Sequence, residues 1–243
     1  MSLLPRGKVY IGQKQQRGVA GDRAAKRSGV LSIDVTSASM NQLGADSVKA
    51  SSLSPFKVGP VFDKHEPTLR AKIFENRWQY GKLWPSAQHM NADQSPSAKW
   101  FEFRSKGYAS DVPKRRPLPR KKFGNATSSY YNGRLHGYVE SRKLVYVPEY
   151  ADLIRGSAAM RELKALLEDG MNILVLDNDA PPKVAYREGR EMNQALWDEM
   201  IENEALPFGH GYVVAALLDG SIDMSAREPA AKRQKTDDAR IPE

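Results

Sequence analysis

The stretch NILVLDND, residues 172–179, gives the clearest signal of a buried strand in the sequence. Its four consecutive apolar residues are followed directly by acidic ones. A short apolar run bounded by polar residues is typical of a strand buried on both faces. Carboxylates at the end of such a strand often face a cleft, so Asp177 and Asp179 are candidates for acid–base chemistry or for binding ribose hydroxyls. Asp residues also form turns and cap helices, and this alternative stays open.

Outward from this strand, extended and helical patterns alternate irregularly. A β-branched run at 30–37 predicts a second strand. A helix is expected at 68–84, because Pro67 suits its start and Pro85 ends it. Further helices are expected at 149–170, 189–206 and within 207–220, and further strands at 99–108 and 142–148. Since this alternation lacks the regular rhythm of a doubly wound sheet, we predict a helix-rich α+β fold.

The length of 243 residues suits one domain with tails. Residues 1–29 are rich in Arg, Lys, Gln and Gly and predict a basic, largely irregular arm. Residues 30–220 are expected to form a single globular domain with a small sheet. Residues 221–243 are polar and charged, which is typical of a disordered tail.

Composition limits the classes of partner. The net charge of +8 favours partners that carry phosphate, such as nucleotides or nucleic acid. The chain has no cysteine, which excludes disulfides and thiolate nucleophiles and fits a reducing compartment. No apolar run approaches the ~18 residues of a membrane span, so no membrane partner is expected. Residues 229–235 resemble a nuclear localisation signal, which predicts a nuclear or cytoplasmic protein, although such a basic string also occurs in a solvated tail.

The stretch FENRWQYGKLWP, residues 74–85, contains the first candidate site. Glu75, Gln79 and Lys82 are spaced by four and three residues, so a helix presents them on one face. A carboxyl, an amide and an ammonium on one face can orient a sugar, polarise a leaving group and hold a phosphate. The alternative is an ordinary solvated helix face.

The stretch PFGHGY, residues 207–212, contains the second candidate site. Gly209 and Gly211 flank His210 directly before a predicted helix. The free amides at a helix start, together with the helix dipole, bind anions. Glycines also allow a phosphate to come close to the backbone. The alternative is a tight turn in which the histidine caps the helix.

Several familiar sites are missing from the sequence. It contains no Walker loop, no Gly-x-Gly-x-x-Gly after a strand and no Gly-x-Ser-x-Gly elbow. Without cysteines or a pair of histidines at ligand spacing, it predicts no metal site and no cofactor.

The order of these motifs resembles an uncharacterised domain family of bacteria and phages. Members of that family carry an Asp-Val-Thr-Ser strand, a Ser-Pro-Phe turn, a Glu-x-x-Trp-Gln-x-x-Lys helix, an Arg-x-x-x-Tyr-x-Pro-x-Tyr segment, a Leu-Leu-Asp strand and a late His turn. Here the same order runs through IDVTS, LSPF, ENRWQYGK, SRKLVYVPEYADLI, ILVLDND and PFGHGYVVAALLDG. The resemblance spans roughly residues 30–220.

That family is in turn distantly similar to NADAR domains, which carry a Glu-His-x-x-Gln-x-x-Lys helix and a late Trp-Gly-x-Gly turn. In this chain Asn76 stands where NADAR domains have His, and Phe208 stands where they have Trp. The resemblance implies an N-glycosidase that acts on a bond to ADP-ribose or a phosphorylated ribose, in a nucleotide or in modified nucleic acid. The catalytic residues it implies are Glu75, Lys82 and Asp177, and the ligand-binding residues are Gln79, Ser54, Phe56, Gly209, His210 and Gly211.

The alternative is a non-catalytic, basic protein associated with nucleic acid or with nuclear partners. The run PKRRPLPRKK, residues 113–122, can contact phosphates, although its prolines exclude a helix that reads a groove. The nucleic-acid contacts expected under this alternative are Lys114, Arg115, Arg116, Arg120, Lys121 and Lys122.

Overall fold

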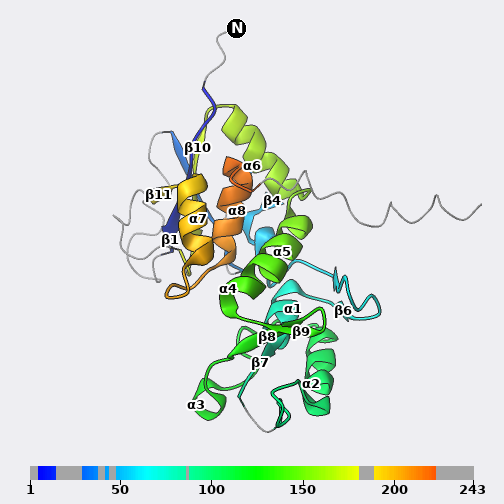
Figure 1. Cartoon of the computed structure of the whole chain (residues 1–243). Helices are drawn as coiled ribbons and strands as arrows, with labels where there is room; N and C mark the ends of the chain where they lie inside the picture. Colours follow the sequence, from blue (N-terminus) through cyan, green and yellow to red (C-terminus); the bar gives the residue numbers. More distant parts are fainter. Residues whose placement is uncertain are drawn as a thin grey trace, which may run out of the picture.

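The computed structural model describes residues 5–14, 29–37, 42–43, 48–85, 88–180 and 189–222. These residues form an α+β body with small sheets and a larger share of helix, which confirms the predicted fold class (Figure 1). Among the described residues, none of the helices is long and apolar enough to cross a membrane.

The largest sheet of the described chain has the strand order β11–β1–β10–β2. Strands β1 (Val9–Gln13), β10 (Asn172–Asp177) and β2 (Val30–Asp34) run parallel, and β11 (Arg190–Glu191) is antiparallel to β1. Strand β10 lies between β1 and β2, and its residues 173–175 are buried. The strand predicted from the apolar run is therefore confirmed, and it lies inside the sheet.

Helices cover this sheet. Helix α8 (His210–Asp219) contacts both β1 and β10 and is buried along almost its whole length. Helices α5 (Val147–Ile154), α6 (Ala158–Glu168) and α7 (Gln194–Glu202) all contact α8. Gly220 ends α8 with a φ of 101°, a left-handed conformation that glycine adopts without strain. Helices are thus confirmed within 149–170 and 207–220. The helix predicted at 189–206 is shorter than expected, because Arg190–Glu191 forms strand β11 and only Gln194–Glu202 is helical.

Many of the remaining elements form the lower half of Figure 1. Helix α1 (Phe74–Tyr80) packs against α2 (Ala98–Tyr108) beside a small sheet of order β7–β8–β9. The shorter elements are β3 (Gln42–Leu43), β4 (Val48–Lys49), η2 (Ala50–Leu53), β5 (Val61–Phe62), β6 (Arg70–Ala71), β7 (Lys82–Leu83), α3 (Arg120–Phe123), β8 (Ser128–Tyr131), β9 (Arg134–His136), α4 (Tyr138–Ser141) and the π-helix η3 (Arg142–Tyr146). Of these, β3, β4 and η2 contact α6 in the upper half of the figure.

A buried ion cluster fixes α1 to α5. The Nη2 atom of Arg77 lies 3.0 Å from Asp63 Oδ2 and 3.0 Å from Glu149 Oε1. Its Nη1 donates to the hydroxyl of Tyr108 on α2 over 2.7 Å. A single buried cation therefore joins α1 to α2, to α5 and to the loop after β5. This network sets where α1 lies relative to the larger sheet.

The helix predicted at 68–84 is much shorter than expected. Arg70–Ala71 pairs with Val61–Phe62 as a hairpin, and Lys82–Leu83 pairs with β8. Only Phe74–Tyr80 is helical. Hydrogen bonding between strands therefore overrides the local helical pattern at both ends, in a hairpin at the N-terminal end and with the distant β8 at the C-terminal end.

Two predicted strands are wrong. The expected strand at 99–108 lies in helix α2, whose start is capped by the Ser97 hydroxyl accepting a hydrogen bond from the amide of Trp100. The expected strand at 142–148 is instead the π-helix η3 running into α5, and Pro148 lies in the first turn of α5, where a missing amide costs little.

The boundaries of the predicted N-terminal arm also need correction. Val9–Gln13, which we expected to lie in an irregular arm, form a strand of the largest sheet. The pairing with β10 lies far away in the sequence and leaves no local signal. Most of the predicted tail, residues 223–243, lies outside the described residues, as does the predicted localisation signal at 229–235.

Candidate functional site

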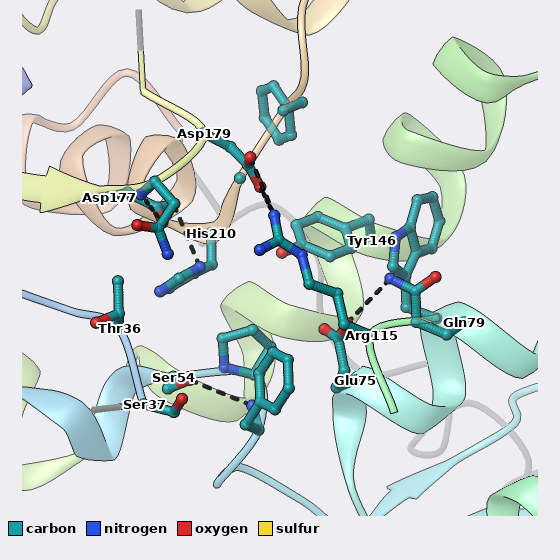
Figure 2. Close-up of a pocket in the computed structure, with 16 residues that line it drawn as sticks. Thr36, Ser37, Ser54, Glu75, Gln79, Arg115, Tyr146, Asp177, Asp179 and His210 are labelled. Carbon is teal, nitrogen blue, oxygen red and sulfur yellow. Dashed lines mark hydrogen bonds and ion pairs between the residues drawn. The ribbon is translucent and has the colours of Figure 1, made fainter. Parts of the chain in front are cut away.

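A pocket of about 160 Å³ lies where the carboxyl ends of β2 and β10 face helix α1 (Figure 2). Thr36 and Ser37 follow β2, and residues 177–179 end and follow β10. Glu75 and Gln79 line the opposite side from α1. The carboxyl ends of parallel strands are a common place for ligands in open α/β sheets. The pocket thus lies between the largest sheet and the part of the body that contains α1.

Asp177 is the best-anchored residue of the pocket. Its Oδ2 accepts the amide of Gly211 over 2.8 Å, and its Oδ1 accepts the amide of Asn178 over 2.7 Å. The Nδ1 atom of His210 lies 3.3 Å from the same Oδ2. Because both carboxylate oxygens are engaged, Asp177 is held rigidly and positions the start of α8.

The two glycines of the late turn allow this close approach. A Cβ atom on Gly209 would lie 2.3 Å from Asp177 Oδ2, and one on Gly211 would lie 2.6 Å from Asp177 Cβ. The predicted anion site at this helix start is therefore occupied by a carboxylate of the protein itself. Gly209 still lines the pocket, whereas Gly211 lies behind it.

His210 links the ends of two parallel strands. Its Nε2 lies 3.0 Å from the carbonyl oxygen of Val35, directly after β2, and its Nδ1 faces Asp177 at the end of β10. Since a carbonyl only accepts, Nε2 carries a hydrogen. The histidine therefore lines the pocket with its ring fixed on both edges.

Glu75, Gln79 and Lys82 form a chain of hydrogen bonds. Gln79 Nε2 donates to Glu75 Oε1 over 2.9 Å, and Lys82 Nζ donates to Gln79 Oε1 over 3.0 Å. Lys82 Nζ also lies 4.6 Å from the ring centroid of Trp78. Lys82 lies on β7, after the helix, and does not line the pocket itself. It contacts Gln79, which does. The predicted trio is thus together in space, but only its carboxyl and amide line the pocket.

Burial shifts the proton affinities of this chain. Glu75 is 4% exposed, and burial raises the pKa of its carboxyl, while the hydrogen bond from Gln79 and the charge of Lys82 oppose the rise. Burial lowers the pKa of Lys82 to about 8, and Glu75 opposes that change. A carboxyl and an amine whose pKa values move toward neutrality are typical of proton-transfer sites.

Aromatic side chains form one wall of the pocket. The ring centroids of Trp78 and Tyr146 are 4.9 Å apart, and those of Tyr146 and Phe208 are 6.3 Å apart. Tyr146 ends the π-helix η3, and π-helices are frequent at functional sites. Burial holds the pKa of Tyr146 well above its ordinary value. Trp78 packs in the core and also lines the pocket.

Arg115 is the cation that lines the pocket. Its Nη2 lies 3.2 Å from both Oδ1 and Oδ2 of Asp179. The fully buried Asn76 on α1 holds the segment that carries Arg115: its Nδ2 donates to the carbonyl oxygens of Ser110 and Val112, and its Oδ1 accepts the amide of Lys114 over 2.9 Å. The residue at the expected histidine position thus places Arg115 beside Glu75.

The other predicted site residues fall into two groups. Ser54 and Phe56 line the pocket from the turn after η2. The remaining predicted nucleic-acid contacts are exposed, and none has an ion pair with a described residue; these are Lys114, Arg116, Arg120, Lys121 and Lys122.

The prediction of ligand contacts missed four lining residues that had a signal in the sequence. Tyr146 is the first tyrosine of the Arg-x-x-x-Tyr-x-Pro-x-Tyr segment, Thr36 and Ser37 end the Asp-Val-Thr-Ser strand, and Asn178 lies between the two acids after β10. Arg115 was assigned to nucleic acid alone. Its place in the pocket depends on the hydrogen bonds of Asn76, for which spacing gives no signal.

No protein-family model, curated protein or solved structure matches this chain. Within the described residues there is no group of three or more His, Asp or Glu side chains that could hold a metal ion.

Proposed function

We propose that this pocket hydrolyses an N-glycosidic bond to a ribose that carries phosphate, as in an ADP-ribosyl compound. One observation supports it most strongly: a buried carboxyl, Glu75, lines the same pocket as two carboxylates at the end of β10 and one arginine. Glycoside hydrolysis commonly uses one protonated and one ionised carboxyl. The arginine supplies a contact for phosphate.

Glu75 is the proposed general acid. Because burial raises its pKa, its carboxyl retains a proton at a higher pH than an exposed glutamate does. It gives that proton to the leaving nitrogen as the bond from C1′ to that nitrogen breaks and its electron pair moves to the nitrogen. The positive charge that develops on the ribose is stabilised by Asp177 and Asp179. A water oxygen then bonds to C1′ and loses its proton to a pocket carboxylate.

The neighbours of Glu75 have supporting roles in this proposal. Gln79 holds the carboxyl by its amide, and Lys82 in turn holds Gln79. Lys82 thus acts through Gln79 and has no direct contact with phosphate. The wall of Trp78, Tyr146 and Phe208 provides flat apolar surface for a leaving base.

The test is release of a base. The protein is incubated with a panel of ADP-ribosylated and ribosyl-phosphate compounds, and free base is detected by mass spectrometry. Glu75→Gln keeps the side-chain volume and removes the proton, so release should fall by about 10²–10⁴-fold. Glu102→Gln, an exposed change on α2, is the matched control and should retain full activity. Release of base by Glu75→Gln at the unmodified rate would rule out this role.

A second candidate function is binding of nucleic acid without catalysis. It is supported by the exposed cations between Lys114 and Lys122, which, apart from Arg115, have no ion pairs with described residues and lie on the segment that leads into the pocket at Arg115. Binding of DNA or RNA should then weaken with salt, and neutralising the six cations should reduce the slope of log K against log salt. An unchanged slope would remove this candidate. A nuclear location remains a prediction from residues 229–235.

A further inference from the structure

The ion pair between Arg115 and Asp179 spans the pocket. Arg115 comes from the segment fixed on α1 by Asn76, and Asp179 comes from the end of β10 (Figure 2). Only the Nη2 atom of the guanidinium bonds to a described residue, and the side chain is 53% exposed. A guanidinium has five N–H donors in a planar fork. The Nε and Nη1 atoms of Arg115 therefore make no hydrogen bond to a described residue and can donate to a ligand.

Asp179 depends on this arginine for its charge balance. Burial raises the pKa of its carboxyl and the negative charge of Asp177 adds to that effect, while Arg115 and His210 oppose it. The charged and titratable groups that face Asp179 from the surrounding elements are Arg115, Asp177, His210, Lys82, Tyr146 and Tyr212. Of these, the cation that bonds directly to the carboxylate of Asp179 is Arg115.

We propose that Arg115 is the side chain that binds substrate phosphate, and that in the free protein it is bonded to Asp179 instead. Substrate phosphate then displaces Asp179 from Arg115, and we call this step the exchange. The freed carboxylate of Asp179 is then the base that takes the proton of the attacking water, while Glu75 protonates the leaving nitrogen. This inference rests on the proposed function, because it assumes a ribosyl substrate with phosphate. Phosphate is the stronger partner, since its several oxygens match the planar fork of a guanidinium and it carries more charge than one carboxylate.

The exchange of Asp179 for substrate phosphate at Arg115 makes phosphate a requirement for turnover as well as for binding. A substrate without phosphate leaves Asp179 bonded to Arg115, so the base is not available. We therefore expect such a substrate to lose kcat in addition to raising KM, since the phosphate contact contributes in the transition state. A phosphate contact used only for binding would change KM alone.

Binding measurements test the exchange without any turnover. ADP-ribose is titrated by calorimetry into four proteins, with ribose as the uncharged probe. Asp179→Asn removes the competing charge, so ADP-ribose should bind about two- to fivefold tighter, the range expected for an exposed ion pair. Arg115→Ala should bind it about tenfold more weakly or worse. Arg116→Ala, an exposed neighbour outside the pocket, should match the unmodified protein. Ribose carries no phosphate and should gain no affinity from Asp179→Asn.

The pH dependence gives a second readout. As the pH falls through the pKa of Asp179, its carboxylate gains a proton and releases Arg115, so ADP-ribose should bind more tightly to the unmodified protein. The diphosphate of ADP-ribose does not titrate near neutral pH, so this change belongs to the protein. In Asp179→Asn this contribution to the pH dependence should be lost, which leaves only the part that Glu75 contributes in both proteins. Asp179→Ala, with thermal unfolding as a check of folding, repeats the measurement with a different side chain.

The outcomes separate this inference from the proposed function. If both Asp179 variants bind ADP-ribose no more tightly than the unmodified protein, or if no variant binds it, the exchange is wrong even when base is released. If both bind more tightly and no base is released from any compound, the exchange stands and the N-glycosidase proposal fails.

Discussion

At the scale of single residues, Gly211 shows how the absence of one methyl group permits the site. A Cβ atom there would lie 2.6 Å from Asp177 Cβ and 3.0 Å from its Oδ2. We predict that Gly211→Ala destabilises the protein by about 1–3 kcal/mol through overpacking, because Gly211 lies in helix α8 and Asp177 ends strand β10, so neither can move easily. Chemical denaturation measures the change in the free energy of unfolding.

Gly137 provides the matched control. It has a φ of −66°, and beyond its chain neighbours no heavy atom lies within 4 Å of the position that an added Cβ would take. Gly137→Ala should therefore change stability by no more than about 0.5 kcal/mol. Equal effects of the two changes would contradict the role given to Asp177 at the start of α8.

The residue types of the pocket were in large part predictable. The spacing of Glu75 and Gln79 and the acids after the apolar strand both pointed to side chains that line it. Lys82 was misplaced because periodicity gives the face of a residue only while the helix continues, and α1 ends at Tyr80. Arg115 could not be predicted, because its position depends on hydrogen bonds to Asn76 from a segment with no regular structure.

At the scale of elements, Asn76 joins α1 to the segment before Arg115. In Asn76→Asp a carboxylate oxygen would replace the amide that donates to the carbonyl oxygens of Ser110 and Val112. We predict a loss of about 2–4 kcal/mol of stability, because the side chain of residue 76 is fully buried and its new carboxylate oxygen would face two carbonyl oxygens without a hydrogen to donate. ADP-ribose binding should weaken as well, since Arg115 is no longer held. Urea unfolding and calorimetry measure the two effects.

An exposed asparagine serves as the control for this prediction. Asn91 also donates through Nδ2, to Ser95 Oγ and to the carbonyl oxygen of Pro96, but in an exposed turn. Asn91→Asp should therefore cost about 1 kcal/mol or less. Unaltered ADP-ribose affinity in Asn76→Asp would show that this link does not position Arg115.

Elements were predictable where their partners are local or their pattern is strong. The buried run of β10 and the apolar helix α8 were identified. The strand β1 was not, because its pairing with β10 comes from far along the chain. Aromatic residues in α2 favour strands by propensity, but the Ser97 cap and packing on α1 make this segment helical.

At the scale of the whole molecule, the Arg77 cluster gives stability a dependence on pH. Burial raises the pKa of Glu149 from its ordinary value of 4.5 to about 7. Between these values the folded protein binds more protons than the unfolded chain, so the free energy of unfolding falls as the pH rises. Glu149→Gln keeps the oxygen that Arg77 contacts and removes the titration. We predict a flatter profile from about pH 5 to 7.5 and a gain of up to about 3 kcal/mol above about pH 7.

Two further variants serve as controls for this prediction. Glu168→Gln changes an exposed carboxyl and should leave the profile as it is. Arg77→Met leaves Asp63 and Glu149 buried without their cation and should cost about 3–5 kcal/mol. Thermal unfolding across the pH range measures all three, and a profile of Glu149→Gln as steep as that of the unmodified protein would contradict the assignment.

The parallel pairing of Val9 with Ile173 and of Leu31 with the same residue also has a consequence for biosynthesis. The two strands that flank β10 both leave the ribosome before β10 has been translated, and at roughly 5–20 residues per second the delay is on the order of 10 s. During that interval their edges have no partner to bond with and are open to aggregation. The nascent chain should therefore benefit from a chaperone, and the pocket should be the last part to mature, because it needs β10 and α8 together.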